Sequence, residues 1–391
     1  MFNKTMQRLG EERSVIREIF EYANKRKQEI GEKNVFDFSL GNPSAPPPPC
    51  VEEEILRLAG VAAAHGYTSA PGAPEVRRAI AQYIRSEFGV PMSEDLVYMT
   101  CGAAASLVIT LSAILREGDE VLVPVPFFPE YRVFVTQAAG TLVPVSTDAA
   151  FHLDLAAIEA AITKKTKIVL LNSPNNPTGA VYEEEEMRAL GALLAKKNAE
   201  RSEPLFLVVD EPYRELCYGD PPVYPMAVYA NTVVLYSFSK SLSLAGERIG
   251  YVAVSPHCAQ AESLFAAICG AARYHGYVCA PSLFQRVAAK CLGASSDIEL
   301  YRTNRNLLYG ALSGMGYSCI VPEGAFYLFV RALEKDAKRF CERAKEHELL
   351  LVPSDSFGVE GFVRISYCVP REVVENSIAA FKKLFEAYRR T

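Results

Sequence analysis

Seven short apolar runs in the middle of the chain constrain its fold more than any other feature. Each has four to six residues, mostly branched or aromatic, without a polar alternation. Such runs are typical of strands that are buried on both faces. Helical patterns at 103–115 and 183–197 separate some of them, which predicts an α/β fold with a mostly parallel seven-stranded sheet and helices on both faces. The runs are residues 97–100, 120–124, 141–145, 167–171, 205–209, 232–236 and 249–254.

A second, smaller domain is predicted from the length of the chain and from a late change of pattern. The 391 residues exceed the ~250 to 300 residues at which single cores stop growing. Five prolines at 41–49 prevent regular structure there and indicate a crossing between domains. We therefore predict a large domain at 46–284 and a small α+β domain formed by 1–45 and 285–391. Its amphipathic helix at 11–30 should pack rather than catalyse.

Composition limits the classes of function. The net charge is −5 and 22% of the residues are charged, so we expect no basic field and no nucleic-acid partner. There is no signal-peptide core and no apolar run approaching ~18 residues, so we expect neither secretion nor a membrane span. The ten cysteines include no CxxC pair and the five histidines no HExxH. We therefore expect no metal site, and the scattered thiols favour a cytoplasmic location.

A group of hydroxyls and cations follows one of the apolar runs. It consists of Ser237-Phe238-Ser239-Lys240, with Arg248 eight residues later. Neighbouring positive charge or partial burial lowers the pKa of a lysine amine, which can then attack a carbonyl near neutral pH. The serines and the arginine could meanwhile hold a phosphate. Taken alone, such a turn before an apolar helix is also typical of a solvated loop.

Polar side chains follow two other runs. Asp210 ends the run 205–209, and Tyr213 comes three positions later; the turn 172–179, which contains Asn176, follows the preceding run. Ligands of parallel α/β sheets bind at the carboxyl ends of the strands. We therefore expect these side chains near a ligand. The alternatives are a helix N-cap for Asp210 and an ordinary turn around Asn176.

The order and spacing of these motifs resemble the class I/II aminotransferases, the aspartate aminotransferase superfamily of pyridoxal-phosphate enzymes. The match extends from Gly41 to Arg364, nearly the whole chain. The resemblance implies the fold type I architecture of these enzymes, pyridoxal 5'-phosphate as cofactor, and a homodimer with shared active sites. The motifs are Asn176-Pro177-Thr178-Gly179, Asp210-Glu211-Pro212-Tyr213, Ser237-Phe238-Ser239-Lys240, Arg248 and Phe362-Val363-Arg364-Ile365-Ser366.

The resemblance assigns roles around the cofactor ring. Lys240 forms the Schiff base and later acts as the general base. Asp210 pairs with the pyridine nitrogen and keeps it protonated, since a cationic ring is the better electron sink. Tyr213 and Asn176 hydrogen-bond the phenolic oxygen of the ring. Phe128 stacks on the ring in a chain without tryptophan, and core packing is its alternative role.

The cofactor phosphate is assigned to three segments. The small residues between the run 97–100 and the next helix allow helix N–H groups to approach an anion closely, although tight helix packing would also explain them. Tyr67 corresponds to a tyrosine that contacts the phosphate of the neighbouring subunit, and an ordinary interface or core tyrosine is its alternative. The set is Gly102, Ala103, Ala104, Ser237, Ser239, Arg248 and Tyr67 of the partner subunit.

The substrate α-carboxylate is assigned to Arg364, because a guanidinium offers a planar fork that pairs with both oxygens. By resemblance, Gly41 and Asn176 flank the same carboxylate. The family also places a cis proline after this asparagine, so we expect a cis bond between Asn176 and Pro177. That geometry would turn the carboxamide toward the cofactor.

The sequence does not decide which amino-acid side chain the site recognises. Ala104 stands where one branch of the family has a lysine that binds a second carboxylate, and Arg273 is a candidate for recognising an acidic side chain. Aspartate, alanine, aromatic and other neutral amino acids all fit. The functional hypotheses are an aminotransferase acting on an L-amino acid and a 2-oxo acid such as 2-oxoglutarate, a C–S β-lyase on the same fold, and a ligand-sensing regulator. The last is disfavoured because the chain begins almost directly with the amphipathic helix and has no room for a DNA-binding domain.

Overall fold

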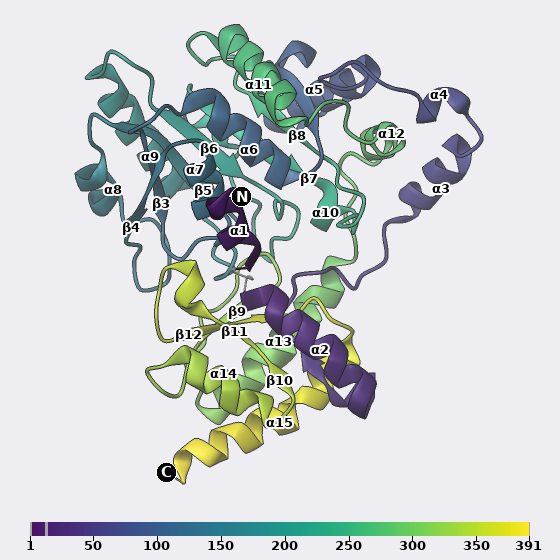
Figure 1. Ribbon diagram of the computed structural model, residues 1–391, viewed down its shortest axis with the longest axis vertical. Coiled ribbons are helices and arrows are strands. Elements are labelled where there is room, and N and C mark those ends of the chain that lie inside the picture. Colours follow the sequence, from purple (N-terminus) through teal and green to yellow (C-terminus); the bar gives the residue numbers. More distant parts are fainter. Residues whose placement is uncertain (1, 12–14, 391) are drawn as a thin grey trace.

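A seven-stranded sheet forms the centre of the larger part of the molecule (Figure 1). In the computed structural model, which describes residues 2–11 and 15–390, the strand order is β2-β8-β7-β6-β5-β3-β4. Strand β8 is antiparallel to both of its neighbours, and the other pairs are parallel. The predicted sheet is confirmed, and each predicted strand end lies within one residue of the observed one. The strands are β2 (Val97–Thr100), β3 (Glu120–Pro124), β4 (Thr141–Val145), β5 (Thr166–Asn172), β6 (Phe206–Asp210), β7 (Thr232–Ser237) and β8 (Gly250–Val254).

Alternate residues of β5 enter two separate hydrophobic cores. Ile168 and Leu170 pack in the core that contains α5, α6 and α11, whereas Val169 and Leu171 pack with α8 and α9. Successive side chains of a strand point to opposite faces, so helices on both faces require an uninterrupted apolar run. The helices of this part are α3 (Pro49–Leu58), α4 (Ala62–His65), α5 (Pro74–Phe88), α6 (Ala103–Ile114), α7 (Tyr131–Gln137), α8 (Leu155–Ala161), α9 (Glu184–Ala199), α10 (Phe238–Ser241), α11 (Ala261–His275) and α12 (Ser282–Lys290), with the 3-10 helices η2 (Glu94–Leu96) and η3 (Pro225–Ala227).

The smaller part combines segments from both ends of the chain (Figure 1). Strand β1 pairs in parallel with β10, and the buried ring of Phe38 lies 6.1 Å from that of Phe381. Strands β11, β12 and β9 form an antiparallel sheet. The domain limits 46–284, 1–45 and 285–391 stay a prediction. The elements are η1 (Glu32–Asn34), β1 (Phe36–Asp37), α13 (Ile298–Met315), β9 (Tyr327–Arg331), α14 (Ala337–Lys345), β10 (Leu349–Leu350), β11 (Val352–Pro353), η4 (Ser354–Phe357), β12 (Phe362–Ser366) and α15 (Arg371–Arg389).

The predicted N-terminal helix is present over most of its length. Helix α2 (Val15–Ile30) buries Ile19 and Ala23, and a separate helix α1 (Lys4–Glu11) precedes it. Residues 12–14 of the predicted helix lie outside the described residues. Figure 1 shows α1 at the junction of the two parts of the molecule. Within residues 2–11 and 15–390, no helix is both long and apolar enough to cross a membrane.

Candidate active site

A cleft of about 510 Å³ opens at the carboxyl ends of the central strands. Asn172, Asp210 and Ser237 are the last residues of β5, β6 and β7, and all three line the cleft. This edge is where parallel α/β sheets bind ligands. Twelve of the fourteen residues assigned from the sequence lie in the lining: Gly41, Ala103, Ala104, Phe128, Asn176, Asp210, Tyr213, Ser237, Ser239, Lys240, Arg248 and Arg364.

Lys240 lies in the short helix α10, which starts directly after β7. The Ser237 side chain caps this helix by accepting a hydrogen bond from the Ser239 N–H. The Lys240 Nζ donates a 2.6 Å hydrogen bond to the carbonyl oxygen of Gly41. Burial, with smaller contributions from the positive charges of Arg248 and Arg364, lowers the pKa of Lys240 to about 8. A substantial fraction of this amine is therefore neutral and nucleophilic near physiological pH.

Asp210 presents one satisfied and one unsatisfied oxygen. Its Oδ2 accepts a 2.7 Å hydrogen bond from the Tyr131 hydroxyl, while its Oδ1 is buried and has no hydrogen-bond partner among the described residues. Burial raises the pKa of Asp210 to about 7, against the lowering effect of the Tyr131 hydrogen bond. A cation at Oδ1 would stabilise the ionised carboxylate. Sequence reasoning missed Tyr131, although it stands only three residues after Phe128.

The segments assigned to phosphate come together at the N-terminus of α6. Gly102, the residue before this helix, has φ +83, and a Cβ there would lie 2.9 Å from an Arg248 guanidinium nitrogen. The Arg248 Nη1 lies 3.4 Å from the Ser239 hydroxyl, which is 2.9 Å from that of Ser237. No side chain caps α6, so its N-terminus is available to an anion. Gly102 does not itself line the cleft, but only glycine leaves room for Arg248 beside it.

Arg364 is almost fully buried in β12, and its guanidinium is only partly satisfied. Its Nη1 donates to the Asn176 carboxamide oxygen at 3.0 Å and its Nη2 to the Ser39 carbonyl at 2.5 Å. Its Nε has no hydrogen-bond partner within the described residues. The ring of Tyr327 lies 4.7 Å from the guanidinium carbon. A buried cation with a free donor fits a carboxylate ligand.

The prediction of a cis bond between Asn176 and Pro177 is wrong. The cis bonds of the described chain precede Pro126 and Pro174 instead. The Asn176 N–H donates to the Asn172 side chain at 2.8 Å, and this bond at the end of β5 directs Asn176 toward Arg364. The carboxamide thus lines the cleft with a trans bond, so the geometric argument for the cis form was incorrect.

Tyr327 is a second residue that sequence reasoning missed. It lines the cleft, and its hydroxyl lies 2.8 Å from that of Tyr213. A side chain at Gly41 would collide with the Tyr327 hydroxyl, so glycine is required there. The sequence around Tyr327 is apolar, and nothing in its pattern indicates which residue faces the cleft.

Helix α2 contributes more than packing. Arg17 and Phe20 line the cleft, whereas Ile19 and Ala23 fill a core. Ile16 lines the cleft and also packs against that core. The side of the helix that borders the cleft thus adjoins the side that borders the core, with Ile16 at their boundary. The amphipathic pattern predicts a helix that only packs, and the sequence does not show that part of it borders the cleft.

Tyr67 and Arg273 lie away from the cleft. The Tyr67 side chain is fully exposed, beside a surface hollow that includes Cys279 and Ala280. Arg273 is exposed near the end of α11 and does not line the cleft. A role for either residue requires a second subunit, so both assignments stay predictions.

The family model for aminotransferase class I and II matches residues 33–381. Among curated relatives, a probable aspartate aminotransferase from Methanocaldococcus jannaschii is 29% identical over 381 residues, covering 95% of this chain and 97% of the relative. The aspartate aminotransferase of Thermotoga maritima is 34% identical over 348 residues, covering 87% and 88%. The chain belongs to the class I and II aminotransferases.

Solved structures agree with this family. The crystal structure of an aminotransferase from Eubacterium rectale superposes with a TM-score of 0.96 at 49% identity and covers 99% of both chains. The aspartate aminotransferase of Thermus thermophilus, solved with maleate, gives a TM-score of 0.88 at 27% identity, covering 98% of this chain and 99% of the other. The protein is therefore an aminotransferase that uses pyridoxal 5'-phosphate.

The residues of the cleft fit this cofactor. The unsatisfied Asp210 Oδ1 offers an acceptor for a protonated ring nitrogen. The Arg248 guanidinium lies against Gly102 at the uncapped N-terminus of α6. Its charge and the helix N–H groups together suit a phosphate dianion. Lys240, with its lowered pKa, offers an amine for the aldehyde. Each of the three groups of the cofactor thus has a complementary partner in one cleft.

Proposed function

We propose that the enzyme transfers an amino group between an L-amino acid and a 2-oxo acid, with 2-oxoglutarate as the acceptor. The observation that carries this proposal is one cleft holding the Lys240 amine, the unsatisfied Asp210 oxygen and the unsatisfied Arg364 Nε. Bound pyridoxal phosphate supplies an electron sink. Lys240 Nζ removes the proton from the substrate α-carbon, and its lowered pKa allows it to accept that proton near neutral pH.

The cofactor would be held on several sides. Asp210 pairs with the ring nitrogen, Phe128 covers the ring, and Tyr213 and Asn176 donate hydrogen bonds to its phenolic oxygen. Tyr131 supports Asp210 through the 2.7 Å hydrogen bond. The phosphate contacts are assigned to Gly102, Ala103, Ala104, Ser237, Ser239 and Arg248, with Tyr67 of the partner subunit.

The substrate α-carboxylate would bind Arg364. Its position is fixed by Asn176 and the Ser39 carbonyl, and its Nε stays available to the ligand. Gly41 would flank the carboxylate, since the absence of a side chain there leaves room between Lys240 and Tyr327. Lysine at position 364 could not reproduce this forked pairing.

Arg17 supports 2-oxoglutarate as the acceptor. A dicarboxylate needs a second cation, and Ala104 cannot provide one. Arg17 lines the same cleft from α2, so its guanidinium could pair with the distal carboxylate. Relatives from several organisms are named aspartate aminotransferases, which agrees with an acidic substrate. Arg273 is not needed in this arrangement.

Relatives named as aminotransferases favour amino transfer over the C–S β-lyase hypothesis. We extend the proposal to a homodimer in which each subunit lends Tyr67 to the other. All ten cysteines are free thiols, which supports the proposed cytoplasmic location.

A half-reaction screen tests the proposed function. Each L-amino acid in turn is mixed with the holoenzyme, and bleaching of the cofactor absorbance identifies the donors. Recovery of the absorbance on adding 2-oxoglutarate confirms the acceptor. An Arg17→Ala variant should lose affinity for 2-oxoglutarate but not for pyruvate, which has no second carboxylate. Steady release of pyruvate and ammonia without an oxo acid would instead show a lyase.

A further inference from the structure

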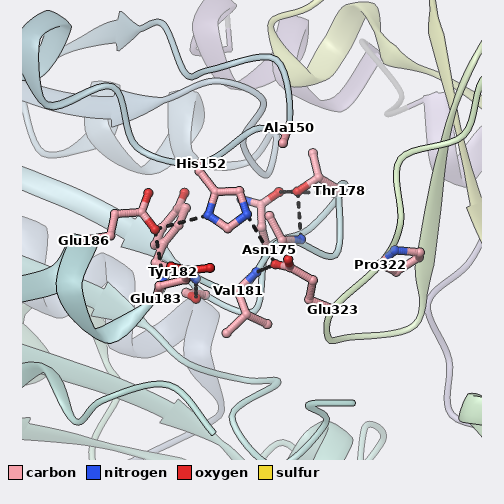
Figure 2. Close-up of polar contacts among 12 residues, drawn as sticks. Ala150, His152, Asn175, Thr178, Val181, Tyr182, Glu183, Glu186, Pro322 and Glu323 are labelled. Carbon is pink, nitrogen blue, oxygen red and sulfur yellow. Dashed lines mark hydrogen bonds and ion pairs between the residues drawn. The ribbon is translucent and has the colours of Figure 1, made fainter. Parts of the chain in front are cut away.

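His152 connects three segments outside the cleft (Figure 2). Its Nδ1 lies 3.1 Å from a carboxylate oxygen of Glu186 in the first turn of α9, and its Nε2 lies 3.4 Å from one of Glu323. Glu323 stands four residues before Tyr327, the first residue of β9. The imidazole therefore lies between one carboxylate beside the central sheet and one on the loop that enters the smaller part of the molecule.

Glu323 in turn holds the turn that carries Asn176. Its carboxylate accepts the Val181 N–H at 2.9 Å. Its own N–H and that of Gly324 both donate to the Gly179 carbonyl at 2.9 Å. Figure 2 shows dashed lines from Glu323 to His152 and to Val181. The loop is thus joined to the turn by backbone bonds at Gly179, and the Glu323 side chain bonds to Val181, two residues further along.

The contact between loop and turn has no spare room. Gly179 has φ +76, and a Cβ there would lie 2.7 Å from Pro322. A Cβ at Gly324 would lie 2.7 Å from Pro174. The loop and the turn are therefore in close contact at both glycines. Because closely packed segments do not slide past each other freely, a shift of Glu323 must also move the turn, and with it Asn176.

The charges around His152 favour its cationic form. The hydrogen bond with Glu186 and then the one with Glu323 raise the pKa of His152 to about 10, against the lowering effect of burial. The His152 backbone N–H also donates to Asp148, at 2.8 Å. The imidazolium is therefore retained at neutral and mildly alkaline pH, where it pairs with both carboxylates.

We propose that His152 is a positioning residue for the active site: it anchors Glu323, and through Glu323 it holds the turn 175–179 so that Asn176 meets Arg364. The effect on catalysis rests on the proposed role of Asn176 and Arg364 in binding the substrate carboxylate. His152 itself touches neither substrate nor cofactor. A purely stabilising role is the competing explanation, since Phe151 also packs on Phe329 and Phe362.

The test compares His152→Gln, Glu323→Gln and the double variant as holoenzymes. The first readout is amide hydrogen exchange, by mass spectrometry, in peptides covering 174–182 and 321–326. The second is the KM for L-aspartate and for 2-oxoglutarate against kcat. We expect faster exchange in both peptides and KM values raised about tenfold, the effect of one lost charged hydrogen bond, with kcat changed less than about threefold. The double variant should be no worse than the worse single variant, because both changes break one chain of contacts.

Two controls separate positioning from stability. Asp336→Ala removes the side-chain cap of α14 and should lower the melting temperature without changing KM. His257→Gln alters an exposed histidine outside the cleft and should change neither. If His152→Gln lowers the melting temperature but leaves exchange in peptide 174–182 unchanged, the proposal is overturned.

An Arg364→Lys variant separates this inference from the proposed function. If Arg364→Lys raises KM but His152→Gln does not, positioning by His152 is wrong and the carboxylate site stands. If neither variant changes KM, the carboxylate site itself is wrong, and so is the effect of His152 on substrate binding. The exchange data then decide only whether His152 holds the turn.

Discussion

The Lys240 amine donates a 2.6 Å hydrogen bond to the Gly41 carbonyl, which lies 199 positions earlier in the chain. The bond joins α10, directly after β7, to the segment that leads from β1 to α3. It places the proposed base beside a residue that cannot carry a side chain, since the Tyr327 hydroxyl occupies that space. The N-terminal segment therefore shapes the catalytic cleft as directly as the central sheet does.

Gly41→Ala should weaken substrate binding. The Tyr327 hydroxyl is buried and bonded to Tyr213, so it cannot move away without losing that bond, and overpacking of this kind costs roughly 1 to 3 kcal/mol. We expect a KM for the amino acid raised about tenfold or more. Adding Tyr327→Phe to Gly41→Ala removes the clashing oxygen and should restore part of the affinity. Gly310→Ala, at a helix position with open space, is the matched control.

Lys240→Ala should abolish turnover while the protein still folds and binds the cofactor. The lysine would make the covalent link in the proposed site, whereas many other residues are proposed to hold the ring and phosphate. Borohydride reduction followed by mass spectrometry should find the cofactor attached to the wild-type chain and to Lys25→Ala, an exposed control. A reducible adduct that persists in Lys240→Ala would assign the role to another lysine.

Asp210→Asn should stabilise the cofactor-free protein at high pH while slowing the chemical step. Burial raises the pKa of Asp210 to about 7 from its model-compound value of 3.8, so the folded state prefers the protonated acid. The contribution of protonated Asp210 to the free energy of unfolding is complete below pH 3.8 and is lost as the pH rises through 7. The free energy of unfolding of Asp210→Asn, relative to that of the wild type, should thus increase by roughly 2 to 3 kcal/mol between pH 5 and pH 8.

Urea unfolding of the cofactor-free proteins at both pH values measures this difference. Half-reaction rates of the holoenzymes should fall by about a thousandfold or more, because the electron sink loses its carboxylate partner. A constant stability difference across pH would show that Asp210 is not titrating in this range, and near-normal rates would remove its catalytic role.

The sheet could be predicted because its strands carry their own signal. A strand such as β5, buried on both faces, must be apolar throughout, and the polar residues that end it mark the edge of the cleft. The motifs around Lys240 and Asp210 follow such strands directly. Their place in the cleft therefore depends mainly on short-range structure and on the strand order.

The residues that were missed depend on long-range packing. Tyr131, Tyr327 and Arg17 reach the cleft from elements whose patterns show only that one face is buried. Nothing in those patterns shows what lies opposite the other face. The error at Pro177 has a similar origin, because the direction of Asn176 is set by its bond to Asn172 and not by the isomer of the next peptide bond.

A last prediction concerns the proposed dimer. The Tyr67 side chain is fully exposed in the single chain, so it is available for a second subunit to cover. In a dimer with shared sites, one active site combines Lys240 of one subunit with Tyr67 of the other. A Lys240→Ala subunit paired with a Tyr67→Phe subunit then contains one site with both native residues.

Mixing the two inactive or impaired proteins under conditions that exchange subunits should therefore raise the activity above the sum of the separate samples. At complete exchange, about half of the dimers are hybrids, each with one native site, so about a quarter of all sites recover. Mixing Lys240→Ala with Lys240→Ala/Tyr67→Phe should give no increase, because no subunit retains the lysine. Sedimentation velocity at assay concentration supplies the independent measurement, and a monomer alone would rule out the shared site.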